Sequence, residues 1–308
     1  MKIRLTIIAL SAAAACSMAV ADTGKLLLTG GVSSIDGAAG GGLTPWATIG
    51  TNATAGEMGV SAHLSRAVVT DYQLNTMGIA FAFDERFEVS FAQQEFNASP
   101  VTALNGLGFS VQNGQRIKMD VLGLKVKVAG DAVLDSDTLM PQIALGVEQK
   151  SVNAGSITPV LDFLGAKTSG TDFYVSATKL FLANSLLVNG TLRYTNANQN
   201  GLVGFGSKAP GTNSASWVPE FSLAYLVNKK IAIGAEYRAK PNNLRSLGQA
   251  ANLGEGLQED AWKDVFIAWA PNKNTSLTLA YLDLGRILPG VTSSRNQSGY
   301  YLSGQFAF

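Results

Sequence analysis

Residues 87–96 read Phe-Glu-Val-Ser-Phe-Ala-Gln-Gln-Glu-Phe, and this stretch decides the fold class. Phe87, Val89 and Phe91 alternate with side chains that are small or polar. Alternation with a period of two residues is typical of a β-strand that has one apolar and one polar face. A length of about ten residues is what a tilted strand needs to cross a bilayer. The stretch therefore predicts a transmembrane β-strand.

The same pattern recurs in twelve segments between residue 56 and the C-terminus. The segments are 56–66, 72–83, 87–96, 116–128, 140–150, 171–182, 185–195, 217–227, 231–239, 261–270, 275–286 and 299–308. Their polar face is mostly Gly, Ala, Ser and Thr with isolated charges, which is typical of a barrel lumen, whereas the outer face of a soluble sandwich is rich in Lys and Glu. The segment 116–128 changes phase around Leu122 and Gly123, where we expect a bulge. The sequence predicts an all-β fold, a transmembrane antiparallel up-and-down β-barrel of twelve strands with a Gly-rich N-terminal segment.

Connection lengths support the barrel independently. Short turns at 84–86, 183–184, 227–230 and 271–274 alternate with the long connections 97–115, 151–170, 196–216, 240–260 and 287–298. The alternation breaks only at 67–71. Short periplasmic turns and long external loops are typical of outer-membrane barrels. Because the predicted strand number is even, we expect both ends of the barrel sequence on the periplasmic side.

The composition excludes several other classes of protein. Only 15% of the 308 residues are charged, against roughly 25% in an average soluble domain. The 23 basic and 22 acidic residues create no basic field, so we expect no nucleic acid partner. No apolar run of about 18 residues follows residue 21, so a chain that spans a membrane must do so as a barrel.

Residues 1–21 predict a cleaved secretory signal peptide. Lys2 and Arg4 precede an apolar stretch, and Ala19-Val20-Ala21 forms a small-x-small cleavage site. An alternative is lipidation at Cys16, which follows Ala14 and Ala15, although position 13 carries Ala where such sites carry Leu. Cys16 is the only cysteine, so cleavage after residue 21 leaves no thiol. The expected location is the outer membrane of a Gram-negative bacterium.

The final strand carries a second targeting feature. Tyr300, Leu302, Phe306 and Phe308 lie in phase, and the chain stops at an aromatic residue. This resembles the terminal β-signal by which the bacterial assembly machinery recognises outer-membrane barrels. The resemblance implies two partners, the barrel assembly machinery and outer-membrane lipid.

Residues 22–55 differ from the rest, with eight glycines and three charged residues. We expect this segment to fold into the lumen as a plug, and a free periplasmic tail is the alternative. The cluster Gly37–Gly42 lacks a following Lys-Ser/Thr and a strand-to-helix context, so we expect no nucleotide and no other cofactor. The domain division is therefore a signal peptide at 1–21, a Gly-rich segment at 22–55 and a barrel at 56–308.

The stretch LLLTGGVSSIDGAAGGGLTPWATIG at 26–50 resembles the N-terminal signature of an uncharacterised family of proteobacterial outer-membrane proteins, known only as a domain of unknown function. The likeness continues through Asp84–Phe91 and Gln94–Phe96. The resemblance implies an outer-membrane barrel over the whole mature chain and gives no activity.

The strand phases predict which polar side chains line the lumen. They are His63, Glu88, Lys118, Asp120, Lys125, Lys127, Glu148, Arg193, Glu220, Glu236, Arg238 and Asp264. Their charges are nearly balanced. An open porin would separate the two signs across a constriction, and a closed barrel would pair them.

His63 is the only histidine, so it would have to serve any imidazole-based catalysis. Twelve-stranded outer-membrane phospholipases that use His with Ser exist, but the phase of Val60, Ala62 and Leu64 points His63 toward the lumen, whereas a lipid hydrolase needs its dyad at the lipid face. We expect no enzyme activity and no metal site. The predicted function is a passive channel or porin for small solutes, with a non-conducting structural or assembly-partner barrel as the alternative and a lipid-modifying enzyme using His63 as the third.

Overall fold

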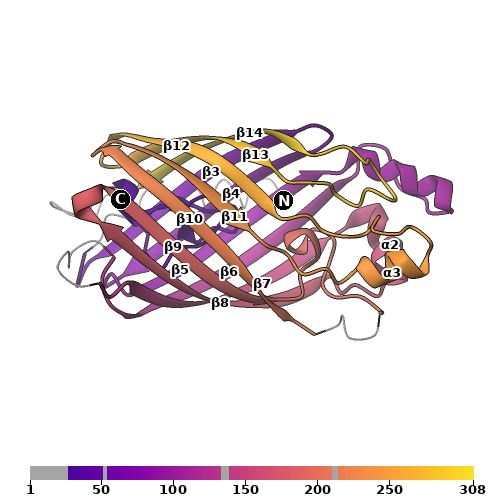
Figure 1. Cartoon of the computed structure of the whole chain (residues 1–308), viewed down its shortest axis with the longest axis horizontal. Coiled ribbons are helices and arrows are strands. Elements are labelled where there is room, and N and C mark those ends of the chain that lie inside the picture. The colour runs from indigo at the N-terminus through magenta and orange to yellow at the C-terminus, as the bar shows by residue number, and fades with distance from the viewer. Residues whose placement is uncertain (1–26, 51–53, 133–138, 210–213) are drawn as a thin grey trace, which may run out of the picture.

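The computed structural model describes residues 27–50, 54–132, 139–209 and 214–308. Within these ranges twelve antiparallel strands, β3 to β14, close into one barrel in which β14 pairs with β3 (Figure 1). The strands are β3 (Met58–Val69), β4 (Gln73–Phe83), β5 (Phe87–Asn97), β6 (Arg116–Ala129), β7 (Gln142–Asn153), β8 (Ser169–Phe181), β9 (Leu186–Thr195), β10 (Ser216–Asn228), β11 (Ile231–Arg238), β12 (Trp262–Asn272), β13 (Thr275–Asp283) and β14 (Ser298–Ala307). The predicted all-β barrel is confirmed, and every expected segment ends within three residues of a strand end.

The two ends of the barrel differ in their connections. The end at which β3 begins and β14 stops carries the connections 84–86, 130–141, 182–185, 229–230 and 273–274, and we call it the short-turn end. The opposite end carries 98–115, 154–168, 196–215, 239–261 and 284–297 together with the tight turn 70–72, and we call it the long-loop end. At the short-turn end Val60 and Phe308 exchange two backbone hydrogen bonds of 2.8 Å, which close the barrel beside its last residue.

Apolar side chains cover the outward face of the strands. Phe81, Phe91 and Leu124 project from one half of the barrel, and Phe221 and Ile267 from the other. In β14, Tyr300, Leu302 and Phe306 are 66%, 58% and 52% exposed and alternate with inward side chains. A continuous outward apolar belt is the surface that lipid surrounds in an outer-membrane barrel.

The helical turns lie in the connections. At the long-loop end they are η2 (Ser99–Leu107), η3 (Gly155–Ile157), α2 (Thr158–Leu164), η5 (Asn198–Gly201) and α3 (Arg245–Ala250), and at the short-turn end η4 (Leu182–Asn184). Figure 1 shows α2 and α3 beyond the strand ends. None of the described helices is long and apolar enough to cross a membrane.

Residues 27–50 run inside the barrel, and all of them are buried. This inner segment contains η1 (Leu27–Gly30) and a two-stranded sheet of β1 (Val32–Ser33) and β2 (Ala39–Gly40). Its backbone bonds to opposite sides of the wall: the Ser33 amide donates to Gln305 on β14 at 2.6 Å, and the Ala47 amide donates to Thr178 on β8 at 2.8 Å. The wall therefore surrounds the inner segment.

Two predictions for β6 are wrong. The strand has no phase change around Leu122 and Gly123, and Lys118 and Asp120 do not face the lumen. Pairing of β6 with β5 runs in unbroken register from Arg116 to Val126, and the irregularity lies later, between Lys127 and Ala129. Lys118 and Asp120 are exposed on the outer face, where they contact Glu95 and Gln93. The physical reason is that the barrel interior is apolar at the long-loop end, so Ile117, Met119 and Val121 face inward there.

Candidate functional site

Two wall carboxylates bind the backbone of the inner segment. Glu236 on β11 accepts from the Leu43 amide at 2.8 Å and from the Thr44 hydroxyl at 2.6 Å. Glu88 on β5 accepts from the amides of Ala39 at 3.0 Å and Gly50 at 2.8 Å. Charge-assisted bonds of this kind are about twice as strong as neutral ones. These two strands therefore fix both the middle and the end of the inner segment.

Glycine is required where the inner segment meets Glu236. A Cβ placed on Gly41 would lie 2.2 Å from Oε1 of Glu236, which is far inside contact distance. A side chain at position 41 would displace the Glu236 carboxylate from its present position beside Leu43 and Thr44. The Gly-rich composition thus has a local structural cause at this position.

Lys125 on β6 binds the inner segment from another side. Its Nζ donates to the carbonyl oxygens of Ala39 at 3.0 Å and Thr48 at 2.8 Å, and it pairs with Glu88 at 3.1 Å. The side chain is buried, so its charge has few alternatives to these partners.

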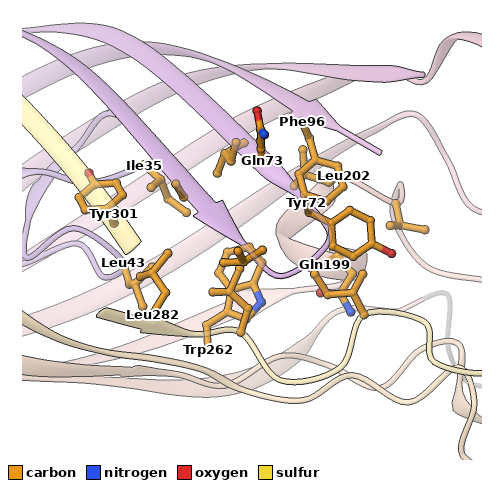
Figure 2. Close-up of a pocket in the computed structure, with 16 residues that line it drawn as sticks. Ile35, Leu43, Tyr72, Gln73, Phe96, Gln199, Leu202, Trp262, Leu282 and Tyr301 are labelled. Carbon is orange, nitrogen blue, oxygen red and sulfur yellow. The ribbon is translucent and has the colours of Figure 1, made fainter. Parts of the chain in front are cut away.

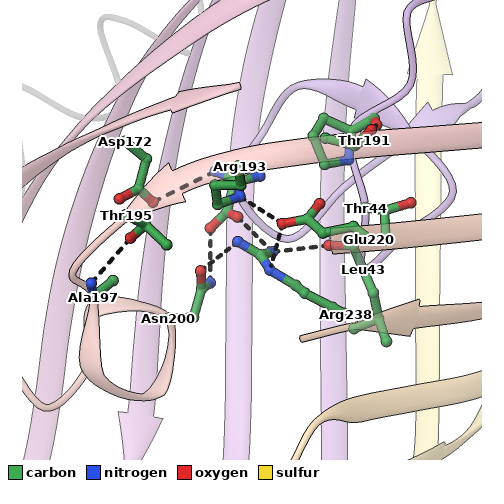
Figure 3. Close-up of polar contacts among 12 residues, drawn as sticks. Leu43, Thr44, Asp172, Thr191, Arg193, Thr195, Ala197, Asn200, Glu220 and Arg238 are labelled. Carbon is green, nitrogen blue, oxygen red and sulfur yellow. Dashed lines mark hydrogen bonds and ion pairs between the residues drawn. The ribbon is translucent and has the colours of Figure 1, made fainter. Parts of the chain in front are cut away.

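A cluster of buried charges crosses the lumen next to the inner segment (Figure 3). We call it the charge layer; it consists of Asp36, Glu148, Lys150, Asp172, Arg193, Glu220 and Arg238. Arg193 on β9 contacts Glu220 at 2.5 Å and Glu148 at 2.7 Å, and Lys150 on β7 contacts Asp172 at 3.0 Å. Each side chain has an oppositely charged neighbour, which offsets the cost of removing the charges from water.

Asp36 is the only member of the charge layer that belongs to the inner segment. Its carboxylate pairs with Arg238 at 2.8 Å and lies 3.6 Å from Lys150. Gln94 on β5 donates to the same carboxylate at 2.9 Å. One side chain thus connects the inner segment to β5, β7 and β11.

The connection between β9 and β10 reaches the same point from the long-loop end. Asn200 donates to Asp36 at 3.0 Å and accepts from Lys150 at 2.9 Å and from Arg238 at 2.5 Å. Gln199 and Asn200 both have positive φ, at 47° and 60°, which turns the chain sharply at its deepest point. Residues 196–209, called the inward loop, and the inner segment therefore meet at Asp36.

Two titratable side chains hold the inward loop near the long-loop end. Lys240 donates to the side chain of Gln199 at 2.7 Å, and Glu259 accepts from the Gln199 amide at 2.8 Å. Both lie in the connection between β11 and β12. Burial lowers the pKa of Lys240 to about 7, and burial raises the pKa of Glu259 to about 7.

The structure brings together most of the side chains assigned to the lumen from the sequence. Glu88, Lys125 and Glu236 bind the inner segment, and Glu148, Arg193, Glu220 and Arg238 belong to the charge layer. Asp264 is buried beside Glu236 as its cross-strand neighbour. Lys127 is half-buried and pairs with Asp131 at 2.8 Å.

His63 lies on the inward face of β3. Its ring is 3% exposed, its Nε2 has no hydrogen-bond partner among the described residues, and it packs against Gly78 on β4, where a Cβ would lie 2.4 Å from the ring. No serine hydroxyl bonds to it within the described ranges. The ring faces the lumen rather than lipid.

Sequence reasoning missed Asp36, Lys150, Asp172 and Asn200. The inward positions of Lys150 and Asp172 could have been predicted from the sequence. Lys150 is in phase with Glu148, and Asp172 is in phase with the inward face of β8. Asp36 carried a weaker signal, because it is the only charged residue between positions 26 and 55. Asn200 lies in a connection, where strand periodicity gives no information.

A narrow cavity of about 40 Å³ lies between the inner segment and the wall (Figure 2). Ile35 and Leu43 of the inner segment face Tyr301 on β14 and Leu282 on β13 across it, and Trp262 on β12 closes one side. A space of this size holds one or a few waters.

The described residues hold no cluster of His, Cys, Asp or Glu that could bind a metal ion. The titratable groups of the lumen face one another or the inner segment instead. The inner segment and the charge layer both lie within the barrel wall.

A closed twelve-stranded barrel with an outward apolar belt and a paired polar interior defines an outer-membrane β-barrel. The chain belongs to the family described as "Protein of unknown function (DUF3034)", whose model matches residues 29–305. The expected membership of an uncharacterised outer-membrane family is therefore confirmed. No curated protein matches the chain.

Several solved structures are similar to this one. A KdgM porin is 11% identical with a TM-score of 0.47, covering 81% of this chain and 99% of its own. A NanC porin is 10% identical with a TM-score of 0.47, covering 81% and 98%. Outer membrane phospholipase A from Escherichia coli is 10% identical with a TM-score of 0.42, covering 81% and 92%. These similarities concern the barrel architecture alone.

Proposed function

We propose that the protein is an outer-membrane channel for small solutes that the inner segment closes. The observation that carries the proposal is the set of contacts that Asp36, Leu43 and Thr44 make with Arg238 and Glu236. These contacts involve charged groups, each worth about 1.5–3 kcal/mol net, and water can solvate the same groups when the segment leaves. A segment held in this way can leave the lumen without unfolding the barrel.

The orientation follows from the connection lengths. We assign the short-turn end to the periplasm and the long-loop end to the exterior, as in other outer-membrane barrels. The inner segment then enters from the periplasmic side, since residues 54–57 contact Asp84 in a short turn. The signal peptide at 1–21, the lipidation alternative at Cys16 and residues 22–26 lie outside the described residues and stay part of this proposal.

The terminal strand serves assembly in this proposal. Tyr300, Leu302 and Phe306 project outward, and Phe308 ends the chain at the closure of the barrel. We assign this edge to recognition by the barrel assembly machinery. We assign His63 no catalytic role, because its buried ring faces the lumen while lipid lies on the other side of the wall.

A non-conducting structural barrel is the second candidate, and the charge layer favours it. Seven buried charged side chains contact one another in the lumen, and a barrel that never opens would need such pairing permanently. The two candidates differ in whether removing the inner segment exposes a path.

Single-channel recording on refolded protein tests the proposal. One variant replaces residues 27–50 by a Gly-Ser stretch of equal length, which keeps the chain length but removes Asp36 and the apolar side chains. We expect rare openings for the full chain and a conductance several-fold higher for the variant. Heat-dependent gel migration is the folding control. A folded variant that conducts no better than the full chain would contradict the channel and favour the structural barrel.

A further inference from the structure

A second, larger cavity lies at the long-loop end. It has a volume of about 550 Å³ and lies among η2, α2, α3 and the connection 284–297, and we call it the outer chamber. Its lining includes Leu104, Phe109, Leu161, Leu253 and Val291. Ligand sites in proteins have volumes of about 300–1,000 Å³, so the outer chamber can hold a small molecule.

The lining of the outer chamber is almost entirely apolar. Thr292 is one of the few polar residues, and its hydroxyl already donates to the carbonyl of Ile287 at 2.7 Å. A sugar or a polyol would lose its hydrogen bonds to water here without replacing them. Each unpaired hydroxyl group would cost roughly 2–7 kcal/mol. An apolar molecule gains about 25 cal/mol for each Å² of apolar surface that leaves water. The lining therefore selects apolar solutes.

The side chain of Lys208 places one positive charge at the wall of the outer chamber. Nζ of Lys208 lies 4.0 Å from the ring centroid of Phe163, and the residue is exposed. Lys208 forms no ion pair with a described residue. No carboxylate lines the outer chamber in the described part of the chain. A single positive charge beside apolar walls favours a ligand with a single negative charge.

The phenol of Tyr72 adds a second polar contact. Its side chain is 2% exposed, and its hydroxyl lies beside the side chain of Thr292, whose own hydroxyl donates to the Ile287 carbonyl. Tyr72 lines both the outer chamber and the narrow cavity of Figure 2.

The apolar lining continues toward the inner segment. Phe96, Val203 and Ile287 border the outer chamber and also the narrow cavity, whose far end is formed by Ile35 and Leu43. A molecule in the outer chamber would thus meet apolar surface until it reaches the inner segment. The charge layer lies to the side of that route, at Asp36 and Arg238.

We propose that the outer chamber binds a small apolar monocarboxylate, with its hydrocarbon part between η2, α2 and α3 and its carboxylate near Lys208. This inference rests on the proposed channel and names the class of solute that the channel admits. The site lies before the closure, on the exterior side in the orientation assigned above.

Equilibrium dialysis on the full chain in lipid nanodiscs tests the site, with empty nanodiscs as background. The probes are radiolabelled decanoate, 1-decanol as a neutral apolar molecule and gluconate as a hydrophilic carboxylate. We expect one saturable site for decanoate and none for gluconate. Saturable gluconate binding as tight as that of decanoate would overturn the proposal.

Three variants locate the site. Ala250 in α3 lines the outer chamber and its neighbour Gln249 does not, so Ala250→Trp should weaken decanoate binding at least about tenfold by filling the space, and Gln249→Trp should leave it unchanged. Leu253→Glu repeats the test by placing a negative charge in the lining. Equal decanoate affinity in all three variants would refute the site.

Lys208→Met tests the charge, with Lys229→Met in a short turn as its control. Removing the Lys208 charge should weaken decanoate binding about fivefold, as for an exposed ion pair, and leave 1-decanol binding unchanged. Equal loss for both probes, or no loss for decanoate, would refute the carboxylate contact.

Flux measurements separate this inference from the proposed function. Decanoate binding with decanoate entry no faster than into protein-free liposomes, even for the variant lacking the inner segment, would refute the channel and keep the site. Entry of gluconate without saturable decanoate binding would keep the channel and refute the site.

Discussion

The charge layer lies inside the barrel, the outer chamber lies among the loops at the long-loop end, and the two differ in almost every property. The charge layer packs Lys150, Arg193 and Arg238 against four carboxylates, whereas the outer chamber has apolar walls and one cation. The difference follows from what each part of the wall surrounds. At the charge layer the wall encloses backbone groups that need partners, and at the outer chamber it encloses apolar loop side chains.

The strand β6 passes through both environments. Lys125 faces inward to bind carbonyl oxygens of the inner segment, and further along Ile117 and Met119 face inward beside the loops. Lys118 is on the outer face at that height and pairs with Glu95. The rule that polar residues face the lumen therefore holds only where lipid surrounds the strand.

Cysteine labelling gives the largest expected difference between the two ends. Gln249 in α3 at the long-loop end and Asn272, the last residue of β12 at the short-turn end, are both exposed. Cys16 is the only cysteine, so cleavage at the expected site after residue 21 leaves no thiol. A cysteine at position 249 should react with an impermeant maleimide on whole cells, and one at position 272 should not. Labelling at position 272 alone would invert the assigned orientation.

Breaking the charge layer should cost far more stability than breaking an ion pair on the outer face. Arg193→Ala leaves Glu148, Asp172 and Glu220 short of a buried partner, and we expect a loss of about 3–5 kcal/mol in the free energy of unfolding. Arg116→Ala removes an exposed partner of Glu95 and should cost about 0–1 kcal/mol. Urea unfolding from lipid vesicles measures both. Similar losses would mean that the charge layer is no more than a set of weak pairs.

Asp36→Asn should loosen the inner segment without emptying the lumen. The amide keeps the size of the side chain but loses the charge that faces Arg238 and Lys150, so we expect about tenfold more channel opening, equivalent to about 1.4 kcal/mol. Ser34→Ala is the control, because the Ser34 hydroxyl has no partner among the described residues. Unchanged opening in Asp36→Asn would show that other contacts hold the segment.

The inward loop should also respond to pH, through the two titratable side chains that contact Gln199. The raised pKa of Glu259 stabilises the docked loop fully below about pH 4.5, and this stabilisation is lost as the pH rises through about 7. The lowered pKa of Lys240 stabilises the docked loop above about pH 10.5, and this is lost as the pH falls through about 7. Hydrogen exchange at the Gln199 amide should therefore be best protected on either side of neutrality, after correction for intrinsic exchange rates.

Glu259→Gln supplies the control for the pH dependence. Without a titrating carboxyl at this position, the change in protection between about pH 4.5 and 7 should disappear, and the change on the alkaline side should remain. An identical profile in the variant would assign the acid-side dependence to another group.

The barrel could be predicted from the sequence because lipid forces a period of two residues on every strand. Phe87, Val89 and Phe91 gave that signal clearly, and the inward positions of Arg193 and Glu236 followed from the same rule. The rule was wrong at Lys118 and Asp120, which lie where the apolar loops fill the interior. Cross-strand and loop contacts such as Asp36 with Asn200 join residues far apart in sequence, so no local pattern contains them.

The outer chamber also could not be predicted from the sequence. Its walls come from connections such as 101–109 and 157–164, whose apolar residues have no strand periodicity. An unusual share of Leu, Val and Phe in loops was the only local signal. Such side chains in external connections indicate that the loops pack on one another.

A reversible lock on the inner segment tests the central claim most directly. The hydroxyls of Thr44 and Ser222 are in hydrogen-bond contact, so Thr44→Cys with Ser222→Cys places two sulfurs within reach of a disulfide. We predict that the oxidised double variant shows no openings in single-channel recordings and that a reductant restores them. The openings of the single variant Thr44→Cys should not change when the reductant is added. Openings of equal size and frequency in the oxidised and reduced double variant, with the disulfide shown to be formed, would contradict closure by the inner segment.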